Sequence, residues 1–174
     1  IPTPQTAFER KQILMLGSLK LYKGPLEFIE LAQRLSQFTF ELVVNDTQEN
    51  INRFVKEHKI NICKNLTIYP QQNDVVPFYN QASLVLNLSD KKQVVETFGL
   101  TALEAMSAGL PVIVPTEGGI AEMVVDGENG YKIDVQNLNQ IAECIKTILS
   151  DETLYMKLAQ NALAYSKRFS EAKM

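Results

Sequence analysis

Short apolar runs alternate along most of the chain with stretches in which apolar residues recur every three or four positions. The runs are typical of buried strands and cover residues 12–16, 38–44, 66–69, 84–88, 110–114 and 131–133. The helical spacings cover residues 25–35, 47–59, 74–81, 100–107, 120–124, 138–149 and 154–168. Continuously apolar strands that alternate with helices are typical of a parallel sheet covered on both faces. The pattern therefore predicts an α/β fold, a doubly wound and mostly parallel sheet of about six strands.

The chain has the size of one domain. Its 174 residues are enough for a proper core, so we expect a single domain over residues 1–174. The opening Ile-Pro-Thr-Pro-Gln-Thr has neither an initiator Met nor a targeting pattern. Residues 1–10 are therefore expected to form a linker, and the chain to be a piece of a longer protein.

Composition excludes several classes of function. The net charge is −3 and the pI about 5.3, which argues against a general nucleic-acid surface. No apolar stretch reaches the roughly 18 residues that span a bilayer. His58 is the single histidine, and the two cysteines, Cys63 and Cys144, have no metal-binding spacing, so a zinc site is not predicted. A Ser-His or Cys-His hydrolase would have to use His58 and is not predicted either. Two unpaired thiols fit a reducing, cytosolic compartment.

The loops that follow strands one, three, four and five should meet at the carboxyl edge of such a sheet, where ligands bind. In the first of these loops Lys23 directly precedes a helix start, and Gly24 would let the backbone approach another segment closely. The alternative for Lys23 is an ordinary solvated lysine in a turn. The spacing between Gly17 and Gly24 fits neither the dinucleotide fingerprint nor a P-loop, which disfavours a nicotinamide enzyme or an NTPase.

Two carboxylates, Glu96 and Glu104, stand eight positions apart around a predicted helix start. A helix N-terminus favours an anion such as phosphate, and a carboxylate accepts hydrogen bonds from neutral hydroxyls. The combination suits a diphosphate with a sugar on one side and a ribose on the other. The alternative is a plain amphipathic helix, because Leu100, Leu103 and Met106 also form an ordinary apolar face.

Four groups of residues resemble one family. They are Gly-x-Leu-x-x-x-Lys-Gly at 17–24, the Glu-x7-Glu pair with Phe-Gly-Leu inside it and Ala-Leu-Glu-Ala-Met-Ser-Ala-Gly-Leu-Pro-Val-Ile at 96–113, Gly-Gly-Ile-Ala-Glu-Met-Val at 118–124, and Asp-Gly-Glu-Asn-Gly-Tyr at 126–131. Nearly the whole chain is similar to the C-terminal half of a GT-B glycosyltransferase, closest to family four of the retaining enzymes. This resemblance implies one Rossmann-like, nucleotide-sugar-binding half of a GT-B fold.

The resemblance also implies roles for individual residues. Glu96 would hydrogen-bond hydroxyls of the donor sugar and Lys23 would neutralise the departing diphosphate, so these two are the predicted catalytic residues. Glu104 would accept from the 2′- and 3′-hydroxyls of the ribose. The backbone amides of residues 98–100 would meet the sugar or the diphosphate. The other implied donor-binding residues are Gly17, Ser18, Tyr69, Gln71, Phe98, Gly99 and Leu100.

One position departs from the family. Where the family usually has an arginine after the first glycine of this loop, the chain has Ser18. Lys20 could supply the second cation, the phosphates could be bound more weakly, or the protein could use its donor differently. Family members need no metal or other cofactor, since lysine and helix dipole carry the phosphate charge, and this chain has no Asp-x-Asp motif.

The function implied is transfer of a hexose from a UDP- or GDP-sugar to an acceptor, in polysaccharide or glycolipid synthesis. The acceptor would be bound by a second Rossmann-like domain that is N-terminal and absent from this chain, so the isolated chain is expected to fold but to be barely active. The protein would be cytoplasmic, with peripheral membrane contact only through the absent half and no nucleic-acid partner. Two alternatives are half of a sugar-nucleotide epimerase and a non-catalytic nucleotide-binding module.

Overall fold

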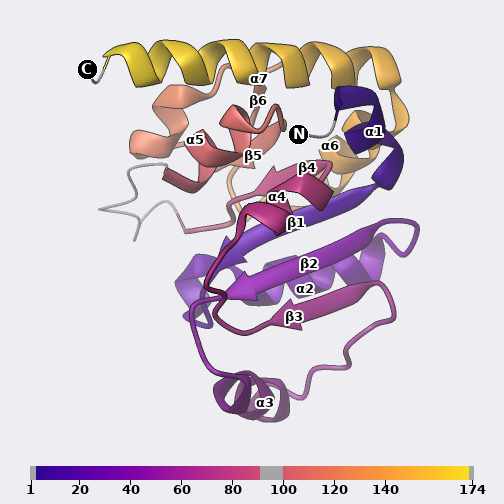
Figure 1. Cartoon of the computed structure of the whole chain (residues 1–174). Helices are drawn as coiled ribbons and strands as arrows, with labels where there is room; N and C mark the ends of the chain where they lie inside the picture. Colours follow the sequence, from indigo (N-terminus) through magenta and orange to yellow (C-terminus); the bar gives the residue numbers. More distant parts are fainter. Residues whose placement is uncertain (1–2, 91–99, 173–174) are drawn as a thin grey trace.

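The computed structural model describes residues 3–90 and 100–172. It contains a six-stranded sheet in the order β3-β2-β1-β4-β5-β6, and every neighbouring pair is parallel (Figure 1). The prediction of a doubly wound parallel sheet of about six strands is confirmed. The strands are β1 (Gln12–Gly17), β2 (Thr39–Val44), β3 (Leu66–Tyr69), β4 (Leu84–Leu86), β5 (Val112–Val114) and β6 (Gly130–Lys132).

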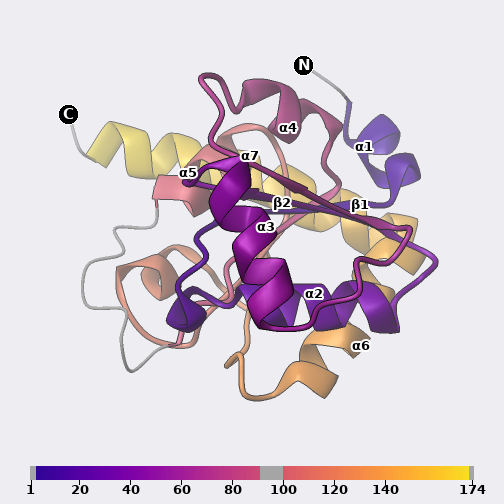
Figure 2. The same ribbon diagram turned by 90° about the horizontal axis from the view of Figure 1, so that it is seen from below.

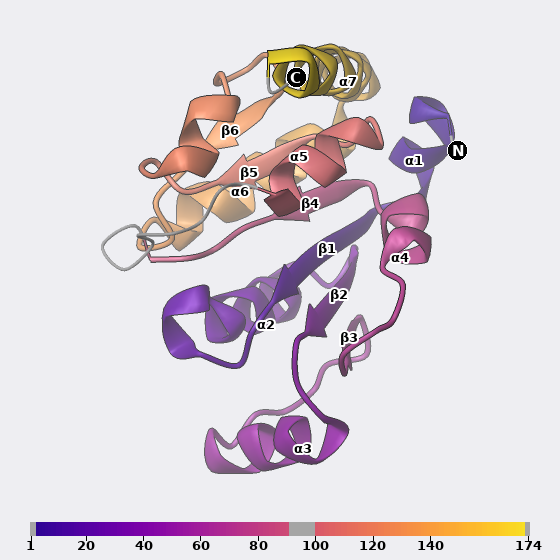
Figure 3. The ribbon, with the colours of Figure 1, turned by 60° about the vertical axis from the view of Figure 1, so that its left-hand side comes forward.

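Helices cover both faces of this sheet. The helices are α1 (Pro4–Arg10), α2 (Pro25–Arg34), α3 (Gln48–Glu57), α4 (Val76–Gln81), α5 (Leu100–Ser107), α6 (Leu138–Ser150) and α7 (Glu152–Ala172), with short 3-10 turns η1 (Leu21–Lys23) and η2 (Gly119–Met123). Figure 2 shows α2 and α6 on one side of the sheet and α1 and α4 on the other. Helix α7 packs against α1, α5 and α6 and runs past the β6 end of the sheet (Figure 3).

The central strands are apolar because both of their faces are covered. Ile13, Phe40, Leu42 and Leu84 are almost fully buried, which is what a parallel sheet between two helix layers demands. Phe28 of α2 meets Phe40 edge to face at 5.4 Å, so α2 is fixed on this face of the sheet. Pro25 opens α2, where a missing backbone N–H costs nothing.

Residues 4–10 form a helix, which corrects the expected linker. Thr3 caps α1 by accepting from the Thr6 amide at 3.2 Å, and Pro4 occupies the first turn. Ala7 is buried, and the ring of Phe8 lies 5.3 Å from that of Tyr155 on α7. The helix is stable because it packs on α7, and the Thr-Pro start was the local signal for it.

Several boundaries also differ from the pattern. Residues 84–88 and 110–114 were expected as whole strands, but only Leu84–Leu86 and Val112–Val114 pair in the sheet. The helix expected from residue 74 begins at Val76, whose amide donates to Asp74 Oδ1 at 3.0 Å. The helix expected at 120–124 is the 3-10 turn η2. An apolar run indicates which residues are buried, but where a strand ends depends on which residues pair with a neighbouring strand. Within the described residues, none of the helices combines the length and apolar character needed to cross a bilayer.

Candidate functional site

The sheet order creates a switch point between β1 and β4. From β1 the chain proceeds outward through α2 to β2, and from β4 it proceeds in the opposite direction to β5. The loops that leave β1 and β4 therefore diverge and leave a crevice at the carboxyl edge, which is where open α/β sheets bind ligands.

Gly24 holds these two loops together. It has a positive φ of 83°, and a Cβ atom placed on it would lie 2.5 Å from both the Cβ and the carbonyl oxygen of Leu88. Two features therefore disfavour any side chain at Gly24: the left-handed backbone conformation and the close approach of Leu88. The Asp90 amide adds a second tie by donating to the Tyr22 carbonyl at 2.7 Å. Both contacts are made by main chain from the loop that follows β4.

Lys23 ends η1 and immediately precedes the N-terminus of α2. Its amide donates to the Lys20 carbonyl at 2.9 Å, and its ammonium lies 5.5 Å from the centre of the Tyr22 ring. Ser18 accepts from the Lys20 amide at 3.1 Å through its hydroxyl, so this side chain stabilises the turn that carries Lys20 and Lys23. Lys20 itself is exposed.

A cavity of about 290 Å³ opens at the ends of β1 and β2 and reaches the first turn of α5. Its lining includes Gly17, Gln71 and Thr101 together with Asn45 and Val75. Backbone hydrogen bonds join these segments, since the Asn45 amide donates to the Gly17 carbonyl and the Gln71 amide donates to the Asp46 carbonyl at 2.8 Å. The end of β1, the residues that follow β2 and β3, and the first turn of α5 thus contribute to one crevice.

Glu104 is an exposed residue of α5, a little more than one helical turn after its first residue, Leu100. Its Oε2 accepts from the hydroxyl of Tyr79, on α4, at 3.0 Å. Both side chains border a second hollow of about 430 Å³, which also includes Val75, Val76 and Ala108. Because Val75 lines both hollows, Glu104 stands beside the crevice that Gly17 and Gln71 line.

Tyr69 is placed differently from Gln71. Its hydroxyl donates to Glu41 Oε2 on β2 at 3.0 Å, and its ring packs edge to face on Phe78 at 5.0 Å. Burial, and then the Glu41 carboxylate, raise the pKa of Tyr69. The Tyr69 side chain therefore packs against the sheet and α4, while Gln71 is exposed and lines the crevice.

Three predicted site residues, Glu96, Phe98 and Gly99, lie outside the described residues. Leu100 is the first residue of α5. The described part therefore brings together Gly17, Gln71 and Glu104 around one region, with Lys23 in the loop that Gly24 ties to the end of β4.

Tyr79, Asn45, Val75 and Thr101 were not predicted at the site. Thr101 follows Leu100 directly, so its place in the first turn of the helix could have indicated it. Tyr79 had no such signal, because it lies 25 positions from its partner Glu104 on another helix.

The turn at residues 126–130, part of the family resemblance, has a structural role. Asn129 is fully buried, accepts from the Val125 amide and donates to the Met123 carbonyl, each at 2.9 Å. A Cβ on Gly130 would lie 2.2 Å from the carbonyl oxygen of Val112, so β6 can approach β5 only with glycine there. In the described part of the chain no group of His, Cys, Asp or Glu could hold a metal ion.

These features define the class of the protein: a Rossmann-like α/β domain whose strand order reverses between β1 and β4, with a crevice at the carboxyl ends of β1 and β2. The family model for glycosyl transferases group 1 matches residues 4–165. The chain belongs to this family, and the predicted resemblance to GT-B glycosyltransferases is confirmed.

Similar proteins extend the comparison. An uncharacterised glycosyltransferase of Methanocaldococcus jannaschii is 38% identical over 158 residues, which cover 90% of this chain and 43% of that protein. The solved C-terminal domain of a glycosyl transferase group 1 family protein from Francisella tularensis has a TM-score of 0.75 and 26% identity, covering 97% of this chain and 93% of that one. HepE from Anabaena, solved with UDP and glucose, shares the fold with a TM-score of 0.76 and 24% identity, covering 97% of this chain and 49% of that one.

The chain spans less than half the length of the curated relatives it matches. It matches nearly the whole of the Francisella domain, however. The family is therefore established for this chain, through matches to a part of each longer relative.

Proposed function

We propose that this chain is the donor-binding half of a retaining glycosyltransferase that transfers a hexose from a UDP- or GDP-sugar. The acceptor would be bound by a second, N-terminal domain, and the product would belong to polysaccharide or glycolipid synthesis. The enzyme would work in the cytoplasm without a metal or other cofactor, and any membrane contact would be made by the other half.

The observation that carries this proposal is the arrangement at the switch point. The starts of α2 and α5 both open at the carboxyl edge, and Gly24 ties the loop before α2 to the main chain that follows β4. Each helix N-terminus favours an anion such as a diphosphate. Glu104 stands on the outer side of the same region, where a carboxylate accepts from ribose hydroxyls but repels a phosphate.

The chemistry explains why a lysine is needed beside this crevice. During transfer the bond between the sugar C1 and a phosphate oxygen breaks and a bond from C1 to the acceptor oxygen forms. Negative charge develops on the leaving diphosphate, and the proton of the acceptor hydroxyl passes to its phosphate oxygen. Lys23 and the helix termini would stabilise this charge, and Glu96 would hold hydroxyls of the sugar. That HepE, which has the same fold, was solved with UDP supports a nucleotide ligand of this kind.

Isothermal titration calorimetry of the 174-residue chain with UDP and GDP tests the proposal. We expect one of the two to bind, and the Glu104→Gln variant to bind it about tenfold more weakly, because it loses hydrogen bonds to a charged acceptor. The matched control is Glu57→Gln, which alters an exposed carboxylate at the end of α3 and should leave the affinity unchanged.

Other outcomes would point to other functions. A folded chain that binds neither nucleotide at millimolar concentration would favour a non-catalytic module over a donor domain. Isomerisation of a sugar nucleotide without acceptor, by the longer protein, would favour an epimerase. Turnover by this chain alone at rates typical of enzymes would contradict the need for a second domain.

A further inference from the structure

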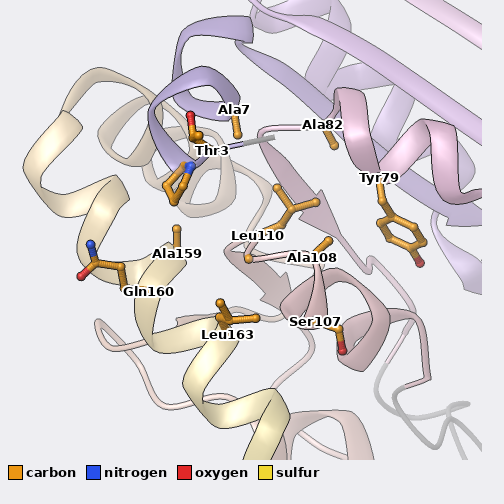
Figure 4. Close-up of a pocket in the computed structure, with 12 residues that line it drawn as sticks. Thr3, Ala7, Tyr79, Ala82, Ser107, Ala108, Leu110, Ala159, Gln160 and Leu163 are labelled. Carbon is orange, nitrogen blue, oxygen red and sulfur yellow. The ribbon is translucent and has the colours of Figure 1, made fainter. Parts of the chain in front are cut away.

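Tyr79 is a core tyrosine whose hydroxyl reaches the site. Its side chain is only 6% exposed, yet its hydroxyl lies 3.0 Å from Glu104 Oε2 and 3.5 Å from the Thr101 carbonyl oxygen. Figure 4 shows Tyr79 at the edge of a cavity between α1, α5 and α7, across from Ala108 and Ser107. Tyr79 thus packs like a core residue at one end and meets an exposed carboxylate at the other.

The hydrogen bond fixes a side chain that would otherwise rotate freely. A glutamate on an exposed helix surface has three rotatable bonds, and ordering it costs conformational entropy. The Tyr79 ring cannot move, since it is buried, so its hydroxyl offers a fixed donor to Oε2. Burial, together with the Glu104 charge, raises the pKa of Tyr79 well above its ordinary value, so the hydroxyl keeps its proton and donates.

One oxygen of the carboxylate remains available. Each carboxylate oxygen has two lone pairs, so a single bond from Tyr79 to Oε2 leaves Oε1 and one lone pair of Oε2 for further donors. Two vicinal hydroxyls, as on an unmodified ribose, can supply two such donors. With its carboxylate ordered beforehand, Glu104 would bind them without first giving up rotational freedom.

We propose that Tyr79 is a positioning residue that orients Glu104 toward the cis-diol of the nucleotide ribose, and so makes the site discriminate ribose from a sugar without these hydroxyls. The inference rests on the proposed function and deepens it. It also links α4 to ligand recognition, since the loop that precedes α4 provides Gln71 and Val75 to the neighbouring crevice.

The test compares UDP with 2′,3′-dideoxy-UDP, and GDP with 2′,3′-dideoxy-GDP, by calorimetry on the wild-type chain and the Tyr79→Phe variant. Phenylalanine keeps the ring and removes only the hydroxyl. We expect the variant to bind the ribonucleotide about fivefold more weakly, because Glu104 must then be ordered on binding, and to bind the dideoxy analogue within about twofold of the wild type. In the Glu104→Gln background, the same change should have a smaller effect, because the two side chains act on one interaction.

Tyr155→Phe is the matched control. Tyr155 is also buried, but its hydroxyl donates to the Ser83 carbonyl at 2.6 Å and not to Glu104. We expect this variant to be less stable but to keep the wild-type ratio of affinities for the ribonucleotide and the dideoxy analogue.

The outcomes separate the inference from the proposed function. Equal weakening of both nucleotides by Tyr79→Phe, or no change in either, would overturn the positioning role while leaving nucleotide binding intact. A wild-type chain that binds neither UDP nor GDP would instead overturn the donor site, and this inference with it. Loss of discrimination in Tyr79→Phe alone is the result that supports the inference.

Discussion

The two sides of the candidate site are held in different ways. The loop at residues 18–24 is positioned by main chain: Gly24 lies against the backbone of Leu88, and Tyr22 accepts from the Asp90 amide. Glu104, on α5, is positioned by one side-chain hydroxyl from Tyr79. The first arrangement depends on the absence of a side chain, the second on the presence of one.

The difference predicts how each side responds to substitution. Removing side-chain atoms cannot loosen a contact made between backbones, but adding a single methyl group can break it. A hydrogen bond from one side chain is lost when a single oxygen is removed, while the fold around it stays. Substitutions in the loop should therefore lower the stability of the fold, whereas substitutions at the Tyr79–Glu104 pair should change ligand specificity.

The largest effect is expected for Gly24→Ala. The new Cβ would lie 2.5 Å from Leu88 atoms in a residue with φ of 83°, so we expect a loss of about 3 kcal/mol in the free energy of unfolding, measured by chemical denaturation. Gly109→Ala is the control, because Gly109 has φ of 75° but no atom within 4 Å of the added Cβ. It should cost only about 1–2 kcal/mol, from the backbone conformation alone. Equal losses in the two variants would contradict the tight contact at Leu88.

The second effect is expected for Lys23→Ala. If Lys23 binds the diphosphate, UDP or GDP affinity should fall about tenfold or more, the value of a charge-assisted hydrogen bond, while affinity for the nucleoside alone should not change. Lys20→Ala is the matched control in the same loop, exposed and three positions earlier. A larger loss in Lys20→Ala, measured by calorimetry, would show that Lys20 is the cation that compensates for Ser18.

The third effect concerns pH. Burial raises the pKa of Tyr79 and Tyr155 above their ordinary value of 10.0. Above that pH the unfolded chain releases these protons and the folded chain retains them, so the free energy of unfolding should fall, by about 1.4 kcal/mol per pH unit for each tyrosine. Below pH 10 this contribution is fully present and stability should not change through these groups.

Denaturation of wild type and Tyr155→Phe between pH 9 and 12 checks this slope. The variant should be about 1 kcal/mol less stable at neutral pH, because it loses the bond to Ser83, but its stability should fall less steeply in alkali. The same slope in both proteins would contradict the raised pKa of Tyr155.

Much of the fold was predictable because local patterns and burial agree. Pro25 at a helix start, Thr47 as a cap and the apolar central strands each signal the structure that forms. Thr47 accepts from the Asn50 amide at 3.1 Å, as a capping threonine should. The sheet order was not encoded in any one stretch, but the alternation of strands and helices restricts it to few arrangements.

The candidate site was predictable only in part. The sequence motif singled out Gly17, Lys23 and Glu104, and the crevice at the end of β1 contains the first of these together with Gln71. Tyr69 was predicted together with Gln71, because the family resemblance places both in a base-contacting loop, but its hydroxyl donates to Glu41. Tyr69 is the last residue of β3 and packs with the sheet, whereas Gln71 lies in the loop that follows, so closeness in sequence does not place a side chain in a site.

The sequence by itself determined the α/β class, the family and the loops that meet at the carboxyl edge, because each depends on hydrophobic periodicity or on a contiguous motif. Only the tertiary structure decided that residues 4–10 pack as a helix on α7, that Gly24 lies against Leu88, and that Tyr79 reaches Glu104. Each of these contacts joins segments far apart along the chain. Their energies come from packing and hydrogen bonds between elements, which no local pattern of residues contains.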